Sequence, residues 1–402
     1  MKRIFHKDVF FSTLFVFLIY LIIEIAFPFN IHFLDPESHT KKDFELSDLF
    51  FSKLQKSEDK VLDTNIIIVN IGNYKRKEIA GQIKTILSYQ PKVLGVDILF
   101  SEKKDVESDS LLIASLKGKK DSVVIANKFE YSTRDEHKIE SIKKPLPELG
   151  MDSSAGFINL ISKEEHSSVR YFKPRLEFNN IQYNSFPSEI VKLCDKAVFD
   201  KLIKRDNDAE IINYKKSNTN FLVLENNEII PDDPRCNILK NKIVLLGFCG
   251  PDTTTRVLED AHFTPLNGNI SGRSFPDMYG VEIQAHIISM IIRDDYINDM
   301  SPFLLLIISF MVCYLHMVYF VKVFVKRHIW FHIIFKIIQL ISAAAMLGIS
   351  LFLFSVLKIK MEPSVIIIPI LLSVDVLYFY DGIVKYLNKK FNYQTYFIQQ
   401  HN

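Results

Sequence analysis

The sequence predicts a mixed α/β (α+β) extracytoplasmic domain with a four-helix transmembrane region, one helix N-terminal to the domain and three C-terminal. Long apolar runs stand at both ends of the chain, short strand-like and helix-like runs alternate between them, and lysine and arginine flank the apolar runs on one side. We divide the chain into the N-terminus with the first span, the domain, the three further spans and a short tail: residues 1–29, 30–301, 302–380 and 381–402.

The first apolar run, Val9 to Phe27, is close to the roughly 20 residues that a helix needs to cross the hydrocarbon of a bilayer. A cleaved signal peptide is the alternative, because the preceding flank is basic. However, the run is longer than the roughly 7 to 15 residues of a signal core, and the segment IEIAFPFN offers no cleavage site between small residues. We therefore favour an uncleaved membrane anchor.

Three further apolar runs follow the domain: Phe303 to Val321, Ile337 to Leu357 and Ser364 to Tyr380. Short cytoplasmic segments of membrane proteins carry an excess of lysine and arginine, which sets the orientation of the spans. Such residues precede the first span, lie between the second and third, and follow the fourth: Lys2, Arg3, Lys7, Lys322, Lys326, Arg327, Lys385, Lys389 and Lys390. Both termini are thus expected in the cytoplasm, and residues 30–301 outside.

The composition argues against several functions. The formal net charge is only +2, and the basic residues are largely used by the flanking pattern, so nucleic acid is not an expected partner. Cys313 lies in a span, and Cys194, Cys236 and Cys249 can form at most one disulfide, which leaves one thiol free. No C-x-x-C spacing occurs, so we expect neither a cysteine metal cluster nor a cofactor.

The domain begins with a strand–helix–strand pattern. The β-branched run Asn65 to Gly72 and the run Lys92 to Phe100 predict strands buried on both faces, and apolar residues at helical spacing lie between them. This unit implies a parallel pair of strands with a right-handed crossover. The segment Glu130 to Gly150 is highly charged and contains two prolines, and we expect it to be an exposed loop.

The remaining elements follow from short apolar runs. Helices are predicted at Asp109 to Leu116, at Pro187 to Lys196 with Ser188 as a candidate cap, and at Val281 to Ile292, which is apolar on most faces and should be buried. Further strands are predicted at Ser122 to Phe129, Gly156 to Leu160, Val169 to Phe172, Ile211 to Tyr214, Phe221 to Glu225 and Lys242 to Phe248.

One loop carries the most polar chemistry. Phe248 to Arg256 (FCGPDTTTR) follows a predicted strand, and the loops after such strands are where open α/β sheets bind ligands. The loop can hold a small polar molecule, or its aspartate and threonines can form an Asx or Ser/Thr turn. A nucleophile elbow at Cys249 is disfavoured, because the required glycine two residues later is Pro251.

A metal site is a further alternative. Asp260, His262, Glu282 and His286 combine two carboxylates with two imidazoles, which are ligands that suit zinc. Glu282 and His286 stand one helical turn apart, but the order of the two residues differs from that of the H-E-x-x-H motif. The same pair also fits an ordinary contact on a helix surface.

Several segments taken together resemble the type-2 CHASE domain (CHASE2), an extracellular sensory module of bacterial signalling proteins. They are VLGVDILFSE with DSLLIASL, GFINL with SSVR, IINY, and the closing block LKNKIVLLGFCGPDTTT, EDAHFTPLN and MYGVEIQAHIISMII. The positions that match motif residues are Asp97, Asp109, Arg170, Asp260, Thr264, Pro265 and Glu282. The resemblance implies an exported ligand sensor whose spans pass a signal inward, commonly to a kinase or cyclase domain.

The sequence departs from that family at two places. Asn70, Gly72 and Asn73 stand where an acidic pair is expected after the first strand, and about twenty residues follow the last span, too few to fold as a catalytic domain. Several of the matching positions can serve the fold alone, since Pro265 can fix a turn and Asp109 fits a helix N-terminus.

We therefore expect a non-enzymatic, multi-pass protein of the bacterial inner membrane that senses a small ligand or a partner and signals through a separate output protein. The expected partners are the lipid bilayer, that output protein and an unidentified small ligand. The alternatives are a structural docking subunit of an envelope complex, or an exported hydrolase that uses Cys249 or the metal-type group. The candidate ligand-binding residues are Asp97, Asp252, Thr253, Thr254, Asp260, His262 and Glu282.

Overall fold

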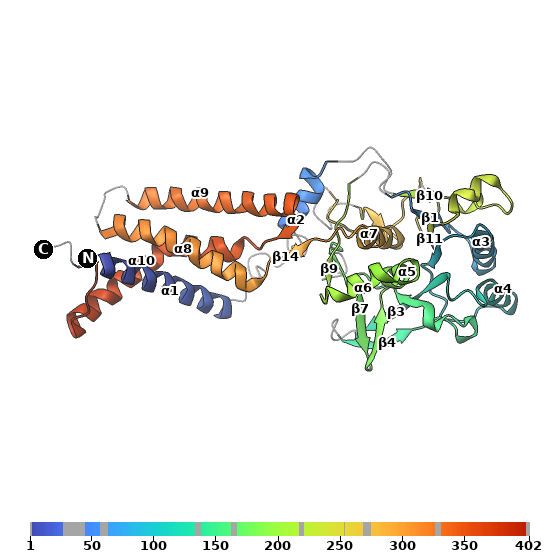
Figure 1. The fold of residues 1–402 in the computed structure, drawn as a ribbon, viewed down its shortest axis with the longest axis horizontal. Helices are drawn as coiled ribbons and strands as arrows, with labels where there is room; N and C mark the ends of the chain where they lie inside the picture. The colour runs from blue at the N-terminus through green and yellow to red at the C-terminus, as the bar shows by residue number, and fades with distance from the viewer. Residues whose placement is uncertain are drawn as a thin grey trace. The chain divides into compact units, whose positions relative to one another are not determined.

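The chain forms two compact units. One, the helical unit, comprises Met1–Ser38 and Asn298–Asn402, and the other, the α/β unit, comprises His39–Ile297. Figure 1 shows the elements of both units with their labels. The computed structural model describes residues 2–26, 45–56, 63–132, 138–161, 167–216, 221–252, 254–267, 275–325 and 331–398.

A central sheet organises the α/β unit. Its strands run in the order β10-β1-β11-β2-β3-β4, and β5 also pairs with β3. All neighbours are parallel except β3 and β4. Every residue of β1, β2 and β11 is buried, as the continuous apolar runs predict. The strands are β1 (Ile66–Asn70), β2 (Val93–Val96), β3 (Val123–Tyr131), β4 (Ile139–Lys143), β5 (Ala155–Phe157), β10 (Leu222–Leu224) and β11 (Ile243–Gly247).

The expected direct pairing of β1 with β2 is wrong. Both strands are parallel members of the sheet, but β11 lies between them, with Ile67 opposite Val244 and Leu245 opposite Gly95. A crossover helix requires only that the two strands share a sheet, and consecutive strands are not always neighbours. β11, the last strand of this sheet in chain order and buried along its whole length, takes the central position instead.

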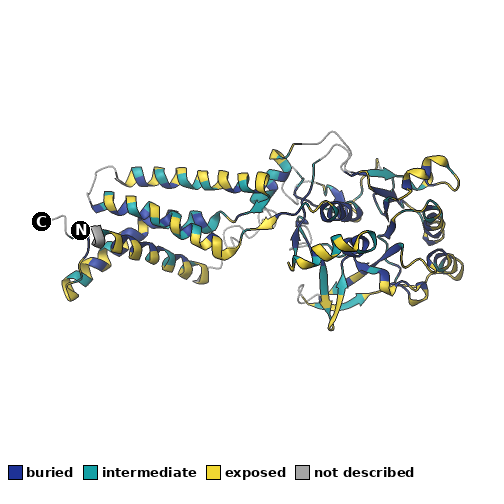
Figure 2. Ribbon diagram, in the orientation of Figure 1, coloured by how far each residue is buried: buried dark blue, intermediate teal, exposed yellow. Residues whose placement is uncertain are grey.

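Helices cover both faces of the sheet, so the α/β unit has three layers. On one face, α3 (Arg76–Ser88) packs with α4 (Val106–Leu116) on a core that includes Ile67, Leu94 and Val244. The opposite face is covered by α5 (Phe186–Cys194) and α7 (Gly280–Ile292). α7 is buried along most of its length, which confirms the prediction from its apolar sequence (Figure 2).

Two glycines of the sheet, Gly95 and Gly247, allow α5 and α7 to pack closely on their face, because a side chain at either position would clash with a helix. A Cβ at Gly95 would lie 2.6 Å from Cδ1 of Ile190 on α5. A Cβ at Gly247 would lie 2.8 Å from the side chain of Val281 on α7. The helices can therefore approach the strands closely, which brings the first turn of α7 to the carboxyl end of β11.

The segment Glu130 to Gly150 is not simply a loop. It contains β4, which pairs antiparallel with β3, and a 3-10 turn at Pro147–Leu149. Its charged residues are compatible with a strand because β4 is the outermost strand of the sheet. Lys143 of β4 forms an ion pair with Glu130 of β3 at 2.6 Å. Charge density alone therefore misidentified an edge strand as a loop.

Smaller elements complete the α/β unit. A hairpin of β7 (Arg175–Phe178) and β8 (Ile181–Asn184) turns at Asn179 and Asn180, which both have positive φ. The predicted cap of α5 is wrong, because Ser185 rather than Ser188 caps that helix. The others are α2 (Leu46–Leu49), the π-helical Phe50–Leu54, α6 (Lys196–Lys204), β6 (Tyr171–Phe172), β9 (Glu210–Ile211), β12 (Ala261–His262), β13 (Met278–Tyr279) and 3-10 segments Asp152–Ser154, Asn226–Glu228 and Pro234–Leu239.

The helical unit contains the four predicted spans. Among the described residues, four helices are long and apolar enough to cross a membrane. Apolar side chains such as Leu340 and Ile341 are largely exposed, as expected for a surface that contacts lipid. The elements are α1 (Lys2–Ala26), α8 (Pro302–Val325), α9 (Phe331–Phe352), the π-helical Leu353–Leu357 and α10 (Ser364–Phe391), with β14 (Asn298–Asp299) pairing parallel to β15 (Ile359–Lys360).

Polar side chains hold the helices of this unit together. Pro369 within α10 lacks an N–H and so leaves the carbonyl of Val365 without its helical donor, and the Ser309 hydroxyl of α8 donates to that carbonyl at 2.7 Å. At the chain termini, the Asp8 carboxylate of α1 accepts from the Tyr396 N–H at 2.6 Å and from the Thr395 hydroxyl at 3.0 Å. The residues after α10 thus pack back onto α1.

Candidate functional site

The carboxyl ends of four parallel strands define one edge of the sheet, the usual binding edge of open α/β folds. β1 ends at Asn70, β2 is followed by Asp97, β10 is followed by Glu225, and β11 leads into Cys249. Polar and ionisable residues thus gather at the edge where the sequence analysis expected a ligand loop.

Asn70 connects three of these strands. Its side-chain oxygen accepts from the backbone N–H of Cys249 at 2.9 Å and of Gly72 at 3.0 Å. Its side-chain nitrogen donates to Glu225 and to the Gly250 carbonyl, both at 3.1 Å. Asn70 is fully buried, and both ends of its amide are satisfied. An aspartate at this position could not make the two donor bonds, so the departure from the family pattern at Asn70 has a structural role here.

The loop after β11 forms the turn that was the alternative to a ligand loop. The Asp252 carboxylate accepts from the backbone N–H of Thr254 at 2.9 Å and of Thr255 at 2.8 Å, and from both threonine hydroxyls. These bonds lower the pKa of Asp252 to about 2. Asp252 and Thr254 are therefore engaged within the loop, and Thr253 lies outside the described residues.

Gly250 shapes the start of this loop. Its φ of +95° is unfavourable for other residues, and an added Cβ would lie 2.6 Å from the Thr255 carbonyl oxygen and 2.9 Å from the Tyr279 hydroxyl. Tyr279, which precedes α7, accepts a hydrogen bond on that hydroxyl from the Val257 N–H at 3.0 Å. The loop is thereby fixed against the N-terminus of α7.

A cavity of about 340 Å³ opens beside this loop. Its walls come from β10, the end of the β11 loop, β13 and the first turn of α7. The lining combines apolar side chains with one arginine and two carboxylates: Phe221, Leu222, Val223, Cys249, Thr255, Arg256, Val257, Ala261, Pro276, Asp277, Met278, Tyr279 and Glu282. This mixture is typical of small-molecule sites, where apolar walls surround a few polar groups.

Glu282 and Arg256 give the cavity its charge. One Glu282 oxygen accepts from the Tyr279 N–H at 2.9 Å, which caps the helix. Burial raises the pKa of Glu282, while that hydrogen bond and the positive charge of Arg256 counteract the rise. Among the described residues, Arg256 forms no ion pair within 4 Å, and its side chain is exposed.

Asp97 and Asp260 form an acidic pair beside the cavity. Burial and the negative charge of Asp260 raise the pKa of Asp97 to about 7. The Asp260 carboxylate lies against Gly280, the first residue of α7, and 3.6 Å from Nε2 of His262. An anionic group is favourable at a helix N-terminus, because the helix dipole is positive there.

The metal alternative finds no support in the described residues, which contain no cluster of three or more His, Cys, Asp or Glu side chains able to hold a metal ion. His286 is buried between the rings of Tyr214 and Phe221, and burial lowers its pKa to about 3. Its ring therefore does not join His262 and Glu282 at the sheet edge.

The cysteines are free thiols: Cys194, Cys236, Cys249 and Cys313. The possible disulfide among the first three is therefore absent. Burial together with the nearby acids, Glu282 first among them, raises the pKa of Cys249. A thiol in such surroundings stays protonated and is a poor nucleophile.

Other motif positions support the fold. Arg170 donates to both oxygens of Asp48, at 2.9 and 2.7 Å, in a buried ion pair. Asp109 pairs with Arg76. Thr264 donates through its backbone N–H to Asp277 at 2.8 Å, so that Asp277 is engaged before any ligand arrives.

Of the predicted site residues, Glu282 lines the cavity, while Asp97 and Asp260 lie beside it and His262 contacts Asp260. Sequence reasoning assigned no role to Arg256 or Tyr279. Arg256 was the last residue of the predicted ligand loop, and the only signal was its position there. Tyr279 gave no signal, because its role depends on the packing of distant segments.

The chain thus combines an α/β domain, with a cavity at the carboxyl ends of its strands, and four described helices that are long and apolar enough to make it a multi-pass membrane protein. The model of the CHASE2 domain family matches residues 38–321, more than half of the chain. The chain therefore belongs to the CHASE2 family of extracellular sensory domains, as the sequence motifs indicated. Neither a curated protein nor a solved structure matches it significantly.

Proposed function

We propose that this protein is a membrane sensor that binds a small ligand in the Arg256–Glu282 cavity and signals through a separate partner protein. The α/β unit lies outside the inner membrane of a bacterium, and both termini lie in the cytoplasm. The observation that carries the proposal is the cavity itself, which joins apolar walls to an arginine without an ion pair among the described residues. The distribution of lysine and arginine around the spans supports the orientation.

α7 offers a route for the signal. Its first turn supplies Glu282 to the cavity, and its C-terminus leads along the chain through residues 293–301 to α8. Because α7 is packed along most of its length, a displacement at its N-terminus is carried by the whole helix. A ligand produces such a displacement only if it binds one of two conformations more tightly.

We propose a non-enzymatic role. The raised pKa of Cys249 argues against a thiolate nucleophile, and His286 is buried away from the cavity lining. The remaining acids of the cavity are held by a helix cap and by Thr264. This arrangement suits binding better than proton transfer to a substrate.

Native mass spectrometry of the full-length protein, gently purified from its own membrane, tests the proposal. We expect a bound small molecule and a partner whose association changes when that molecule is removed. The double variant Asp260→Asn/Glu282→Gln should lose the ligand response and keep its thermal transition. A partner bound in fixed stoichiometry without ligand dependence would instead identify a docking subunit, and loss of the thermal transition would assign both residues to the fold.

The proposed topology has its own test. Protease added to intact spheroplasts should cut within residues 30–301 and leave the tail 381–402 intact. Cleavage restricted to the tail would show that the orientation is inverted, and a sensor of external ligands would then be excluded.

A further inference from the structure

We propose that the ligand is a small zwitterion, an α-amino acid with an apolar side chain, whose carboxylate pairs with Arg256 and whose ammonium group pairs with Glu282. This inference rests on the proposed ligand-binding function and specifies its chemistry. Three features of the cavity support it: an available cation, an available carboxylate and an apolar wall.

Arg256 differs from the other arginines that the structure describes in the α/β unit. Every other arginine that the structure describes there forms an ion pair, with partners Asp109, Asp48, Asp206, Glu210, Asp233 and Asp63 for Arg76, Arg170, Arg175, Arg205, Arg235 and Arg293. Arg256 has no such partner among the described residues and lines the cavity. A guanidinium matches the planar geometry of a carboxylate, with which it can form two parallel hydrogen bonds.

Glu282 is the carboxylate that remains available to a cationic group. Asp277, the other acid of the cavity lining, already accepts two hydrogen bonds from Thr264, through its N–H and its hydroxyl. In Glu282 the cap engages one oxygen, and no described donor reaches the other. A half-buried carboxylate with a free oxygen gains more from an ammonium partner than an exposed one does, because surrounding water screens it less.

The apolar part of the cavity lining is the third feature, and it requires that the ligand carry an apolar side chain of limited size. Beside its few polar groups, the cavity lining includes the apolar side chains of Phe221, Leu222, Val223, Val257 and Met278. A volume of about 340 Å³ lies at the lower end of the range for small-molecule sites, roughly 300 to 1,000 Å³. One amino acid with an aliphatic or aromatic side chain fits these limits, whereas a longer peptide exceeds them.

Calorimetric titration of the full-length protein in detergent tests the inference with defined probes. L-leucine and L-phenylalanine represent the zwitterions. 4-Methylpentanoate and 3-phenylpropanoate lack their ammonium groups, and leucinamide and phenylalaninamide lack their carboxylates. We expect at least one zwitterion to bind at least tenfold more tightly than both of its truncated analogues. Arg256→Gln and Glu282→Gln should each weaken that binding at least tenfold, and Glu282→Gln retains the helix cap.

Arg235→Gln is the matched control, because Arg235 is paired with Asp233 and does not line the cavity. Its affinity for the zwitterion should equal that of the unmodified protein. Thermal transitions of all three variants show whether any loss of binding reflects unfolding. If Arg256→Gln loses its transition, it is replaced by Arg256→Lys, which keeps the charge and should retain part of the affinity.

Two outcomes overturn the zwitterion inference and leave the proposed function standing. The first is equal binding of 4-methylpentanoate and leucine, with no effect of Glu282→Gln. The second is failure of every probe to bind while native mass spectrometry finds a different small molecule in the protein. If neither a probe nor a native ligand binds, the proposed function fails together with the inference.

Discussion

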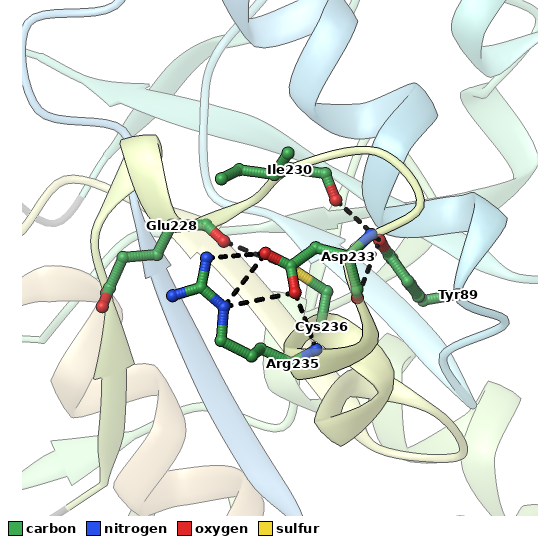
Figure 3. A network of polar contacts seen from close by, with 6 residues as sticks. All are labelled: Tyr89, Glu228, Ile230, Asp233, Arg235 and Cys236. Atoms are coloured by element: carbon green, nitrogen blue, oxygen red, sulfur yellow. Dashed lines mark hydrogen bonds and ion pairs between the residues drawn. The ribbon is translucent and has the colours of Figure 1, made fainter.

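Two polar regions of the α/β unit lie near opposite ends of the central strands, and they treat charge differently. In Figure 3 the Asp233 carboxylate pairs with Arg235 at 2.7 Å, and the Tyr89 hydroxyl accepts from the Asp233 N–H at 2.8 Å. Tyr89 directly follows α3, close to the amino end of β2. The charges of Asp233 and Arg235 are paired with each other, and the hydrogen bond from Arg235 lowers the pKa of Asp233.

At the carboxyl ends of the strands, the charges are not matched in this way. Asp97 and Glu282 have raised pKa values, and Arg256 has no ion pair among the described residues. A region whose charges are already paired contributes to the fold and offers little to a ligand. Unmatched charges around a cavity cost stability, and a ligand that completes them recovers that free energy. The comparison therefore points to the carboxyl edge as the functional one.

The largest expected effect comes from Asn70→Asp, because it adds a further unmatched charge to this edge. The variant loses the donor bonds to Glu225 and to the Gly250 carbonyl, and it places two carboxylates together. We expect the free energy of unfolding to fall by about 3 kcal/mol at neutral pH. Denaturant unfolding of the full-length protein measures this change.

Asn73→Asp is the control, because Asn73 is exposed and its replacement should leave stability nearly unchanged. Acid should partly restore the stability of Asn70→Asp, since a buried carboxyl with a raised pKa regains its proton and one donor. Equal stability of the two variants at neutral pH would show that Asn70 does not hold the edge together.

Gly250→Ala should have the next largest effect. The new Cβ would lie 2.6 Å from the Thr255 carbonyl oxygen at a φ of +95°, so the loop must shift. We expect a loss of about 2 to 3 kcal/mol and weaker ligand binding. Gly118→Ala, at φ +73° with no atom within 4 Å of the added Cβ, should cost only about 1 kcal/mol. If both variants lose the same amount, backbone strain alone explains the effect and the cavity wall is not involved.

The sequence was sufficient to predict the elements whose signal is local. The apolar spans, the buried strands β1 and β11, and the largely buried α7 all follow from continuous apolar runs. The same local reasoning failed for β4, because charged residues on an edge strand look like a loop. It also missed the position of β11 between β1 and β2, since strand order depends on contacts between distant segments.

The candidate site was predictable only in part, for the same reason. The loop after β11 and Glu282 could be identified because they follow a strand and begin a helix. The internal turn of Asp252 was one of two open readings, and only the hydrogen bonds decide between them. Arg256 lacks an ion pair among the described residues because of where each acidic residue lies in the folded unit, and the sequence does not show those positions.

Asp97→Asn tests the charge mismatch through pH. The pKa of Asp97 is raised to about 7, whereas in the unfolded chain it is near 4, so the native state holds this proton over that interval. Stability therefore falls as pH rises from about 4 to 7, and the asparagine variant should lack this decline. Because part of the side chain is exposed, we expect a gain of roughly 1 to 2 kcal/mol at pH 8. Parallel pH profiles of both proteins would refute the mismatch.

The smallest effect should come from Asp233→Asn in the matched network. Asparagine keeps the cap that Asp233 provides to the Arg235 N–H at 2.9 Å, so the variant removes only the ion pair. Because Arg235 is largely exposed, we expect a small decrease in melting temperature in low salt that disappears in high salt. Ligand affinity should not change, since neither residue lines the cavity. A large decrease in stability that persists in high salt would place this network, rather than the carboxyl edge, among the determinants of the fold.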